Sequence, residues 1–238
     1  MAERRVWDPS AGSFGALTMG LYRFAAVELA LIVATVPTWI AFMFLDRHPS
    51  NIPLYAVFAL PVGPAIQAAV YAFRSGSDGL PEPWRRFWRG WRTGLKQSLV
   101  VWTPAVVLGG LTLMNLAYAD AAAVAFPLVI AGLVLAGVVA VISVAALTVI
   151  ATFTFRTRDL AKVTIFGLGS RPMSAIGVLA VAFLAGVLLV FTFDAVLLLL
   201  AALFCFGLLA TARPMLAAVQ QALTDTAGSS IGTAGTAD

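Results

Sequence analysis

The residues of this chain best suited to chemistry lie in one basic and aromatic stretch, PEPWRRFWRGWRTGLKQSL, from Pro81 to Leu99. On a helix of about 3.6 residues per turn, the stretch has one aromatic face and one basic face. Guanidinium groups bind carboxylates and phosphates, and indoles favour the headgroup depth of a membrane. The pattern therefore predicts an interfacial helix over residues 81–97. Its candidate contact residues for a partner or for lipid are Trp84, Arg85, Phe87, Trp88, Arg89, Trp91, Arg92 and Lys96.

This helix has three interpretations that the sequence leaves open. It can orient the flanking apolar segments, offer a docking surface to a protein partner, or recognise an anionic lipid or phosphorylated ligand. Gly90 and Gly94 within it either weaken the helix slightly or allow close packing against another helix.

A second candidate site consists of polar and helix-breaking residues inside apolar segments. Glu28 is one: an ionised carboxylate in hydrocarbon costs at least a few kcal/mol, so it should face other helices, pair or be protonated. We expect Arg23 or an arginine of the amphipathic helix to satisfy it, and a proton- or substrate-coupling acid is the alternative. Gln67 is expected to form interhelical hydrogen bonds. Gly63 and Pro64 are expected to kink their helix, and broken helices can bind substrates in transporters.

Motifs for catalysis or for metal binding are missing from the sequence. It contains no nucleophile–base pair, HExxH-like ligand set or clustered carboxylates within its apolar segments. His48 is expected to be a solvated loop residue, and the single Cys205 allows no intramolecular disulfide. We therefore expect a protein without enzymatic activity, without a catalytic residue, and without a bound metal or cofactor.

The elements that must position these residues are apolar helices. The chain is 61% hydrophobic and only 11% charged, a composition that a soluble domain of 238 residues does not sustain. About 20 apolar residues cross a hydrocarbon core of about 30 Å. The predicted fold is thus all-α, a polytopic membrane protein with about six transmembrane helices. The expected spans are Gly20–Leu45, Ile52–Phe73, Ser98–Tyr118, Ala122–Phe155, Pro172–Phe193 and Ala195–Ala212.

The charges predict how the spans are oriented. Of the 15 basic residues, all but Arg47 fall on one side of the expected spans. The positive-inside rule makes that side cytoplasmic and places both termini there, in the multi-pass plasma membrane of a bacterium. Spans five and six would form a tight hairpin with Asp194 at its tip, because one helix from Pro172 to Arg213 would be about 60 Å long. Five spans with an external C-terminus remain the rival interpretation.

The expected organisation is one membrane domain with two terminal segments. Residues 1–19 form a cytoplasmic N-terminal segment, residues 20–219 form the transmembrane domain, and residues 220–238 form a disordered C-terminal tail. The net charge of +4 is explained by loops that meet anionic lipid headgroups rather than by nucleic acid. Small residues in span four make a homo-oligomer plausible.

Several short motifs resemble the YesL-like family of bacterial membrane proteins of unknown function, DUF624. The resemblance rests on Gly63-Pro64-Ala65 followed by Ala68 and Tyr71, on the run Phe87-Trp-Arg-Gly-Trp-Arg, and on Gln97-Ser98-Leu99. It is specific over Tyr22 to Pro104 and only topological beyond. Family members often carry Asn near the middle of the first span, where this chain has Glu28. They tend to be encoded beside carbohydrate ABC transport systems, which implies an accessory role in sugar uptake.

The sequence therefore favours a non-enzymatic membrane protein accessory to a carbohydrate transport system. Its partners would be ABC transporter subunits, contacted through the aromatic-basic helix. The alternative is a small independent transporter or channel that uses the kinked second span with Glu28 and Gln67.

Overall fold

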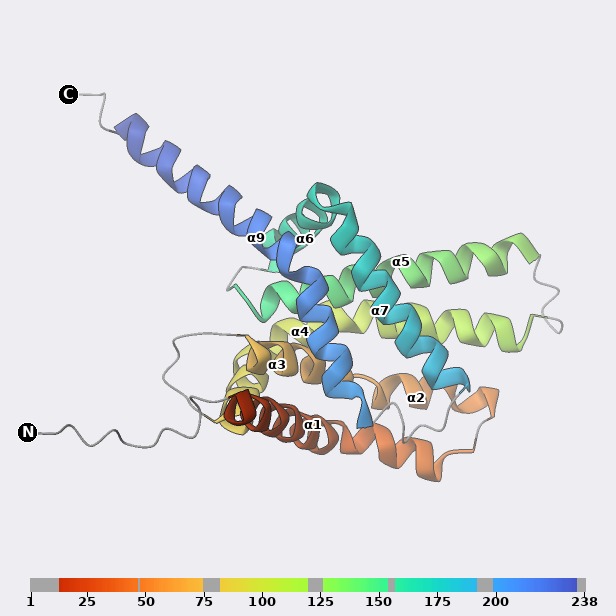
Figure 1. The fold of residues 1–238 in the computed structure, drawn as a ribbon. Helices are drawn as coiled ribbons and strands as arrows, with labels where there is room; N and C mark the ends of the chain where they lie inside the picture. Colours follow the sequence, from red (N-terminus) through yellow and green to blue (C-terminus); the bar gives the residue numbers. More distant parts are fainter. Residues whose placement is uncertain are drawn as a thin grey trace, which may run out of the picture.

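The computed structural model describes residues 13–46, 48–74, 82–119, 126–153, 157–191 and 199–234, and every regular element in these ranges is a helix. Figure 1 shows them as a bundle from which the last helix projects. The elements are α1 (Ser13–Phe44), η1 (Pro49–Asn51), α2 (Ile52–Phe58), α3 (Val62–Phe73), α4 (Pro83–Ala117), α5 (Phe126–Ile150), α6 (Thr157–Ser170), α7 (Pro172–Phe191) and α9 (Ala201–Ala234).

The helices are long and apolar enough to cross a bilayer repeatedly. Among the described residues, five stretches meet that description: Leu17–Phe44, Pro49–Phe73, Pro83–Ala117, Pro127–Ile150 and Ala201–Thr224. A sixth is formed by α6 and α7 if this pair, bent by 104°, counts as one span. The chain is therefore a multi-pass helical membrane protein by the length and hydropathy of its helices.

Pairs of residues in contact show that neighbouring helices run antiparallel. Gln67 of α3 touches Gly94 of α4, and Tyr71, farther along α3, touches Gly90, which is earlier in α4. In the same way, Gly177 of α7 faces Thr211 of α9, and Gly207 of α9 faces Val181. α7 and α9 are therefore two packed helices, not one continuous helix (Figure 1). The predicted hairpin tip, Asp194, lies outside the described residues.

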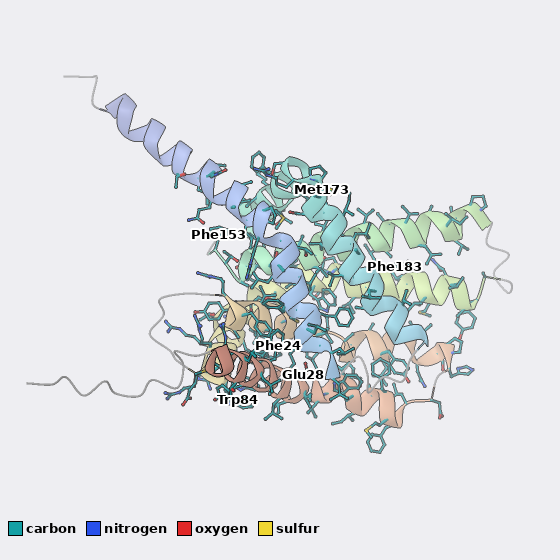
Figure 2. All side chains as sticks on the ribbon, viewed as in Figure 1. Phe24, Glu28, Trp84, Phe153, Met173 and Phe183 are labelled. Carbon is teal, nitrogen blue, oxygen red and sulfur yellow. The ribbon has the colours of Figure 1, made fainter. Side chains whose placement is uncertain are left out.

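The core of the bundle lies where α3, the second half of α5 and α9 meet. Small residues such as Ala68 and Ala69 are fully buried there, which lets the helices approach closely. Every residue of α5 from Ser143 to Ile150 is buried. The outer surface is apolar instead: Phe183 of α7 is 70% exposed, and Figure 2 shows it pointing away from the bundle. An apolar exterior is what lipid-facing helices require.

The predicted kink in the second span is a complete break. The span consists of α2 and α3, separated by a turn at residues 59–61 that includes Pro61. Two backbone carbonyls near the break accept side-chain hydrogen bonds from neighbouring helices. Thr38 Oγ1 of α1 donates to Phe58 O at 2.6 Å, and Trp102 Nε1 of α4 donates to Ala59 O at 3.1 Å. The neighbours thus supply partners that lipid cannot offer.

The predicted separate interfacial helix at residues 81–97 is wrong. α4 is a single helix of 35 residues that begins at Pro83 and includes the third span. At about 1.5 Å per residue it is about 52 Å long, well beyond the hydrocarbon thickness of about 30 Å. No proline lies between Trp84 and Thr103, so no helix breaker of this kind separates the charged half of α4 from its apolar half.

The C-terminal segment also differs from expectation. α9 continues to Ala234, so residues 220–234 are helical, whereas a tail without regular structure was predicted. Good helix formers such as Gln220, Gln221 and Leu223 favour this continuation. The last residues, 235–238, lie outside the described part.

A basic face on α4 and an acid beside α9

The first half of α4 presents an aromatic side to the bundle and a basic side to the outside. Phe87 is fully buried, whereas Trp84, Trp88 and Trp91 are half-buried and pack against the core. The side chains of the opposite side are exposed: Arg85, Arg89, Arg92 and Lys96. The predicted division into two faces is therefore confirmed. The aromatic side also packs against protein, and the predicted depth of its indoles among headgroups stays a prediction.

Close packing against α3 fixes the position of this half of α4. Gly90 lies against Tyr71, and Gly94 lies against Gln67. A Cβ atom on Gly90 would come within 3.0 Å of Tyr71 Cβ, which is tighter than ordinary contact. Of the two roles predicted for these glycines, close packing is the observed one.

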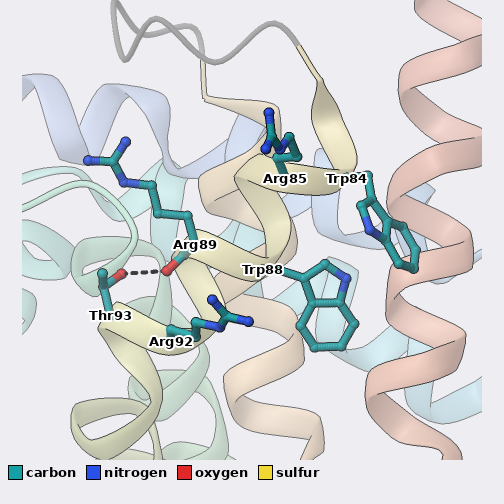
Figure 3. A pocket seen from close by; sticks show the side chains of 6 residues that line it. All are labelled: Trp84, Arg85, Trp88, Arg89, Arg92 and Thr93. Carbon is teal, nitrogen blue, oxygen red and sulfur yellow. Dashed lines mark hydrogen bonds between the residues drawn. The ribbon is translucent and has the colours of Figure 1, made fainter.

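A groove of about 550 Å³ runs along the exposed side, and we call it the α4 groove. Its lining residues, drawn in Figure 3, are Trp84, Arg85, Trp88, Arg89, Arg92 and Thr93. The rings of Trp84 and Trp88 meet edge to face at 5.8 Å between centroids. Thr93 Oγ1 donates to Arg89 O at 2.9 Å, which directs the hydroxyl to the helix backbone. The groove therefore combines an indole wall with three guanidinium groups.

The positive charge of the α4 groove is not neutralised within the described residues. Arg85, Arg89 and Arg92 form no side-chain hydrogen bond or ion pair there. α4 itself contains no Asp or Glu, and Glu82 precedes its first residue. Guanidinium groups spaced along one helix face can bind carboxylates or phosphates with two parallel hydrogen bonds each. The groove is suited to an anionic partner.

Glu28 has a partner that the sequence did not reveal. Its Oε2 accepts a hydrogen bond of 2.7 Å from the backbone N–H of Ala202, in the first turn of α9. Figure 2 shows Glu28 on α1 beside this helix end. The expected pairing with Arg23 is wrong, because Arg23 Nη2 donates to Phe73 O at 3.3 Å. Free N–H groups at a helix N-terminus attract a carboxylate, so the backbone takes the place of a basic side chain.

The remaining predicted residues of the second span lie at the α3–α4 interface. Gln67 is 2% exposed, and its buried Oε1 has no hydrogen-bond partner among the described residues. The interhelical hydrogen bond expected of its Oε1 is thus not observed. Gly63 lies against the side chain of Trp102, and Pro64 is buried in the first turn of α3. No hydrogen bond in the described part joins Gln67 to Glu28, so these two do not form one polar site.

Sequence reasoning missed the role of Arg74, the last described residue after α3. Its Nη1 donates to Ala151 O at 2.8 Å and to Thr152 O at 3.0 Å, at the end of α5. Its guanidinium also lies 5.9 Å from the ring centroid of Tyr71. A cation placed at a helix C-terminus satisfies free carbonyls and complements the helix dipole. The only signal in the sequence is a basic residue directly after an apolar helix.

The described residues contain no group of three or more His, Cys, Asp or Glu side chains able to hold a metal ion. His48, in the connection between α1 and α2, has its Nδ1 2.8 Å from Ser50 Oγ. It is exposed, as expected of a loop residue.

Comparison with protein-family models matches residues 24–116 to the family described as a protein of unknown function, DUF624. The comparison with curated proteins found no match, and the comparison with solved structures found none either. The matched segment extends from Phe24 in α1 to Leu116 in α4, so it includes Glu28, the broken second span and the α4 groove. Over residues 24–116 the chain is therefore a DUF624 family domain.

Proposed function

We propose that this protein is a non-enzymatic accessory component of a membrane transport system and binds its partner through the α4 groove. Carbohydrate is the class of solute that the family resemblance implies, and ABC transporter subunits are the partners that it implies. The observation that carries the proposal is a set of three guanidinium groups, without a partner among the described residues, beside two half-buried indoles.

The chemistry of the groove supports a protein partner. Trp and Arg are the residue types that dominate binding energy at protein interfaces, because they combine large area with directional hydrogen bonds. Gly90 and Gly94 hold the backbone of this half of α4 against α3, so the backbone that carries the groove needs little ordering on binding. We expect the partner segment to carry Asp or Glu side chains opposite Arg85, Arg89 and Arg92.

The distribution of basic residues supports a cytoplasmic location for the groove. Arg74, Arg85 and Arg171 lie where α3 ends or where α4 and α7 begin, and Arg23 lies in the first third of α1, where it contacts Phe73 O near the end of α3. The antiparallel contacts bring these helix ends to the same end of the bundle. By the positive-inside rule this end faces the cytoplasm. The groove would then be reachable by the cytoplasmic parts of a transporter.

The test is affinity purification of the full chain from native membranes, followed by identification of the retained proteins. Changing Arg85, Arg89 and Arg92 together to Glu should abolish co-purification of transporter subunits, because like charges would then face each other. The matched control changes the same three residues to Lys, which keeps the charge and removes the planar fork. Retention of the same subunits by the Glu variant, shown to be folded by its thermal unfolding, would remove the groove from consideration.

A second candidate function is a small transporter or channel that uses Glu28. It is favoured by the buried Oε1 of Glu28, which has no hydrogen-bond partner among the described residues. The occupied carbonyls of Phe58 and Ala59 count against an open path at the break in the second span. Proteoliposomes that hold the pure chain test it: solute or proton flux abolished by Glu28→Gln would support this function over the accessory one.

A further inference from the structure

α6 is a short helix set across the direction of the apolar helix that follows it. It has 14 residues and makes an angle of 104° with α7. A helix of that length is about 21 Å long, too short to cross a hydrocarbon core of about 30 Å. α7, with 20 residues, is long enough to cross alone. Taking α7 alone as the sixth span, the 104° angle sets α6 roughly parallel to the membrane surface.

One side of α6 is fixed to the bundle. Leu160 and Thr164 are buried, and Gly167 lies against Met215 and Val219 of α9. The opposite side is not covered by the described residues: Ile165 is 60% exposed and Phe166 is 54% exposed. The apolar exposure continues onto the start of α7 at Met173 (Figure 2).

Two basic residues accompany this apolar surface. Lys162 lies one helical turn before Phe166, and Arg171 separates α6 from α7, and both are exposed. Long basic side chains beside exposed Ile and Phe are typical of helices that lie in the interface of an anionic leaflet. α6 also follows the C-terminus of α5, near the carbonyls that Arg74 contacts. It therefore belongs to the same basic end of the bundle.

We propose that α6 is an interfacial anchor that binds the anionic phospholipid leaflet at the basic end of the bundle. Ile165 and Phe166 enter the boundary between headgroups and acyl chains, while Lys162 and Arg171 contact lipid phosphates. Because α6 is fixed to α9 through Gly167, its binding to the leaflet sets the depth of α9 in the membrane. This inference does not depend on the accessory function.

Nitroxide labelling of the full chain tests the proposal in vesicles of equal parts phosphatidylcholine and phosphatidylglycerol. The background is Cys205→Ala, which removes the single cysteine, and labels are placed at Ile165→Cys and Phe166→Cys. Collisions with oxygen report hydrocarbon, and collisions with a water-soluble nickel chelate report water. The references are Asp159→Cys on the exposed polar part of α6 and Phe183→Cys on the lipid-facing surface of α7.

The oxygen-to-nickel collision ratio at residues 165 and 166 is expected to be severalfold higher than at residue 159 and lower than at residue 183. A ratio equal to that at residue 159 would place α6 in water and overturn the proposal. Protection from both reagents would also overturn it, because another protein would then cover the surface.

A second measurement uses the unaltered chain, in case the labelled variants do not fold. Phosphatidylglycerol that carries a photoreactive group at the top of one acyl chain is included in the same vesicles. Adducts on residues 163–170 are expected, in addition to those on α7. Adducts on α7 with none on residues 163–170 would contradict the proposal.

Discussion

The side-chain carboxylate of Glu28 and the backbone N–H of Ala202 form a hydrogen bond of 2.7 Å that joins α1 to the first turn of α9. The first N–H groups of a helix have no partner within the helix, and lipid cannot supply one. Glu28 supplies the hydrogen-bond acceptor for Ala202, which lies 174 positions later in the sequence. An acid inside an apolar span is thus explained by the fold before any role in transport is needed.

Glu28→Ala is therefore expected to lower the free energy of unfolding by about 1–3 kcal/mol, because the backbone N–H of Ala202 would lose its hydrogen-bond partner. Glu28→Gln keeps one carbonyl acceptor and should cost less. The thermal midpoint of the pure protein in detergent measures both changes. If Glu28→Ala unfolds at the same temperature as the unaltered chain, the contact with Ala202 does not hold α9 in place.

Gly90→Ala tests the close contact between α4 and α3. The added methyl group would lie 3.0 Å from Tyr71 Cβ, an atom that moves only with the α3 backbone, so a loss of about 1–3 kcal/mol is expected. Gly109→Ala is the matched control in the same helix, because nothing lies within 4 Å of the added atom. It should be neutral or stabilising by up to about 1 kcal/mol, since Ala favours helix more than Gly does. Equal thermal midpoints for the two variants would contradict the packing described.

Arg74→Ala removes the two hydrogen bonds to Ala151 O and Thr152 O. The end of α5 should then open more often, and protease should cleave after residue 153 faster than in the unaltered chain. Arg92→Ala, in the exposed groove, has no such bond among the described residues and should leave the rate unchanged. Cleavage at equal rates in both variants would show that Arg74 does not protect this helix end.

α4 shows which of its features the sequence could predict and which it could not. The spacing of Trp84, Phe87 and Trp91 correctly predicted a helix and its buried side, because helical periodicity is local information. The spacing did not show whether the aromatic side contacts lipid or protein, because indole rings are favourable in both environments. The predicted helix ended where the charged run ends, near Lys96, whereas α4 continues to Ala117. The apolar residues that follow Lys96 continue a helix as readily as the charged ones do, so the change in polarity does not mark a helix end.

The partners of Glu28 and Arg74, which are distant in the sequence, could not be predicted for a different reason. Glu28 binds a backbone N–H, and Arg74 binds backbone carbonyls, and every residue has these groups. A residue-type pattern therefore gives no indication of which helix end lies opposite. The expected pairing of Glu28 with Arg23 was based on opposite side-chain charges, and such charges give no information about the backbone N–H of Ala202. The DUF624 resemblance, by contrast, rested on contiguous motifs, and the matched segment of residues 24–116 confirms it.

At the break in the second span, two side chains from different helices donate hydrogen bonds to the backbone carbonyls of Phe58 and Ala59. Trp102→Phe keeps the aromatic contact with Gly63 and removes the N–H that donates to Ala59 O. Hydrogen bonds between membrane helices contribute about 0.6 kcal/mol on average and up to about 1.7 kcal/mol, so a small but measurable loss of stability is expected. Thr38→Val removes the donor to Phe58 O and should have an effect of similar size.

The variant that carries both Trp102→Phe and Thr38→Val tests whether the two hydrogen bonds stabilise the break together or separately. If the two donors hold neighbouring carbonyls of one turn, the two losses should be non-additive, because α2 and α3 are already free to move once one donor is gone. Thermal unfolding of the two single variants and the double variant completes the cycle. If the two losses of stability simply add, each hydrogen bond stabilises its own carbonyl, and the two bonds are not coupled through the break.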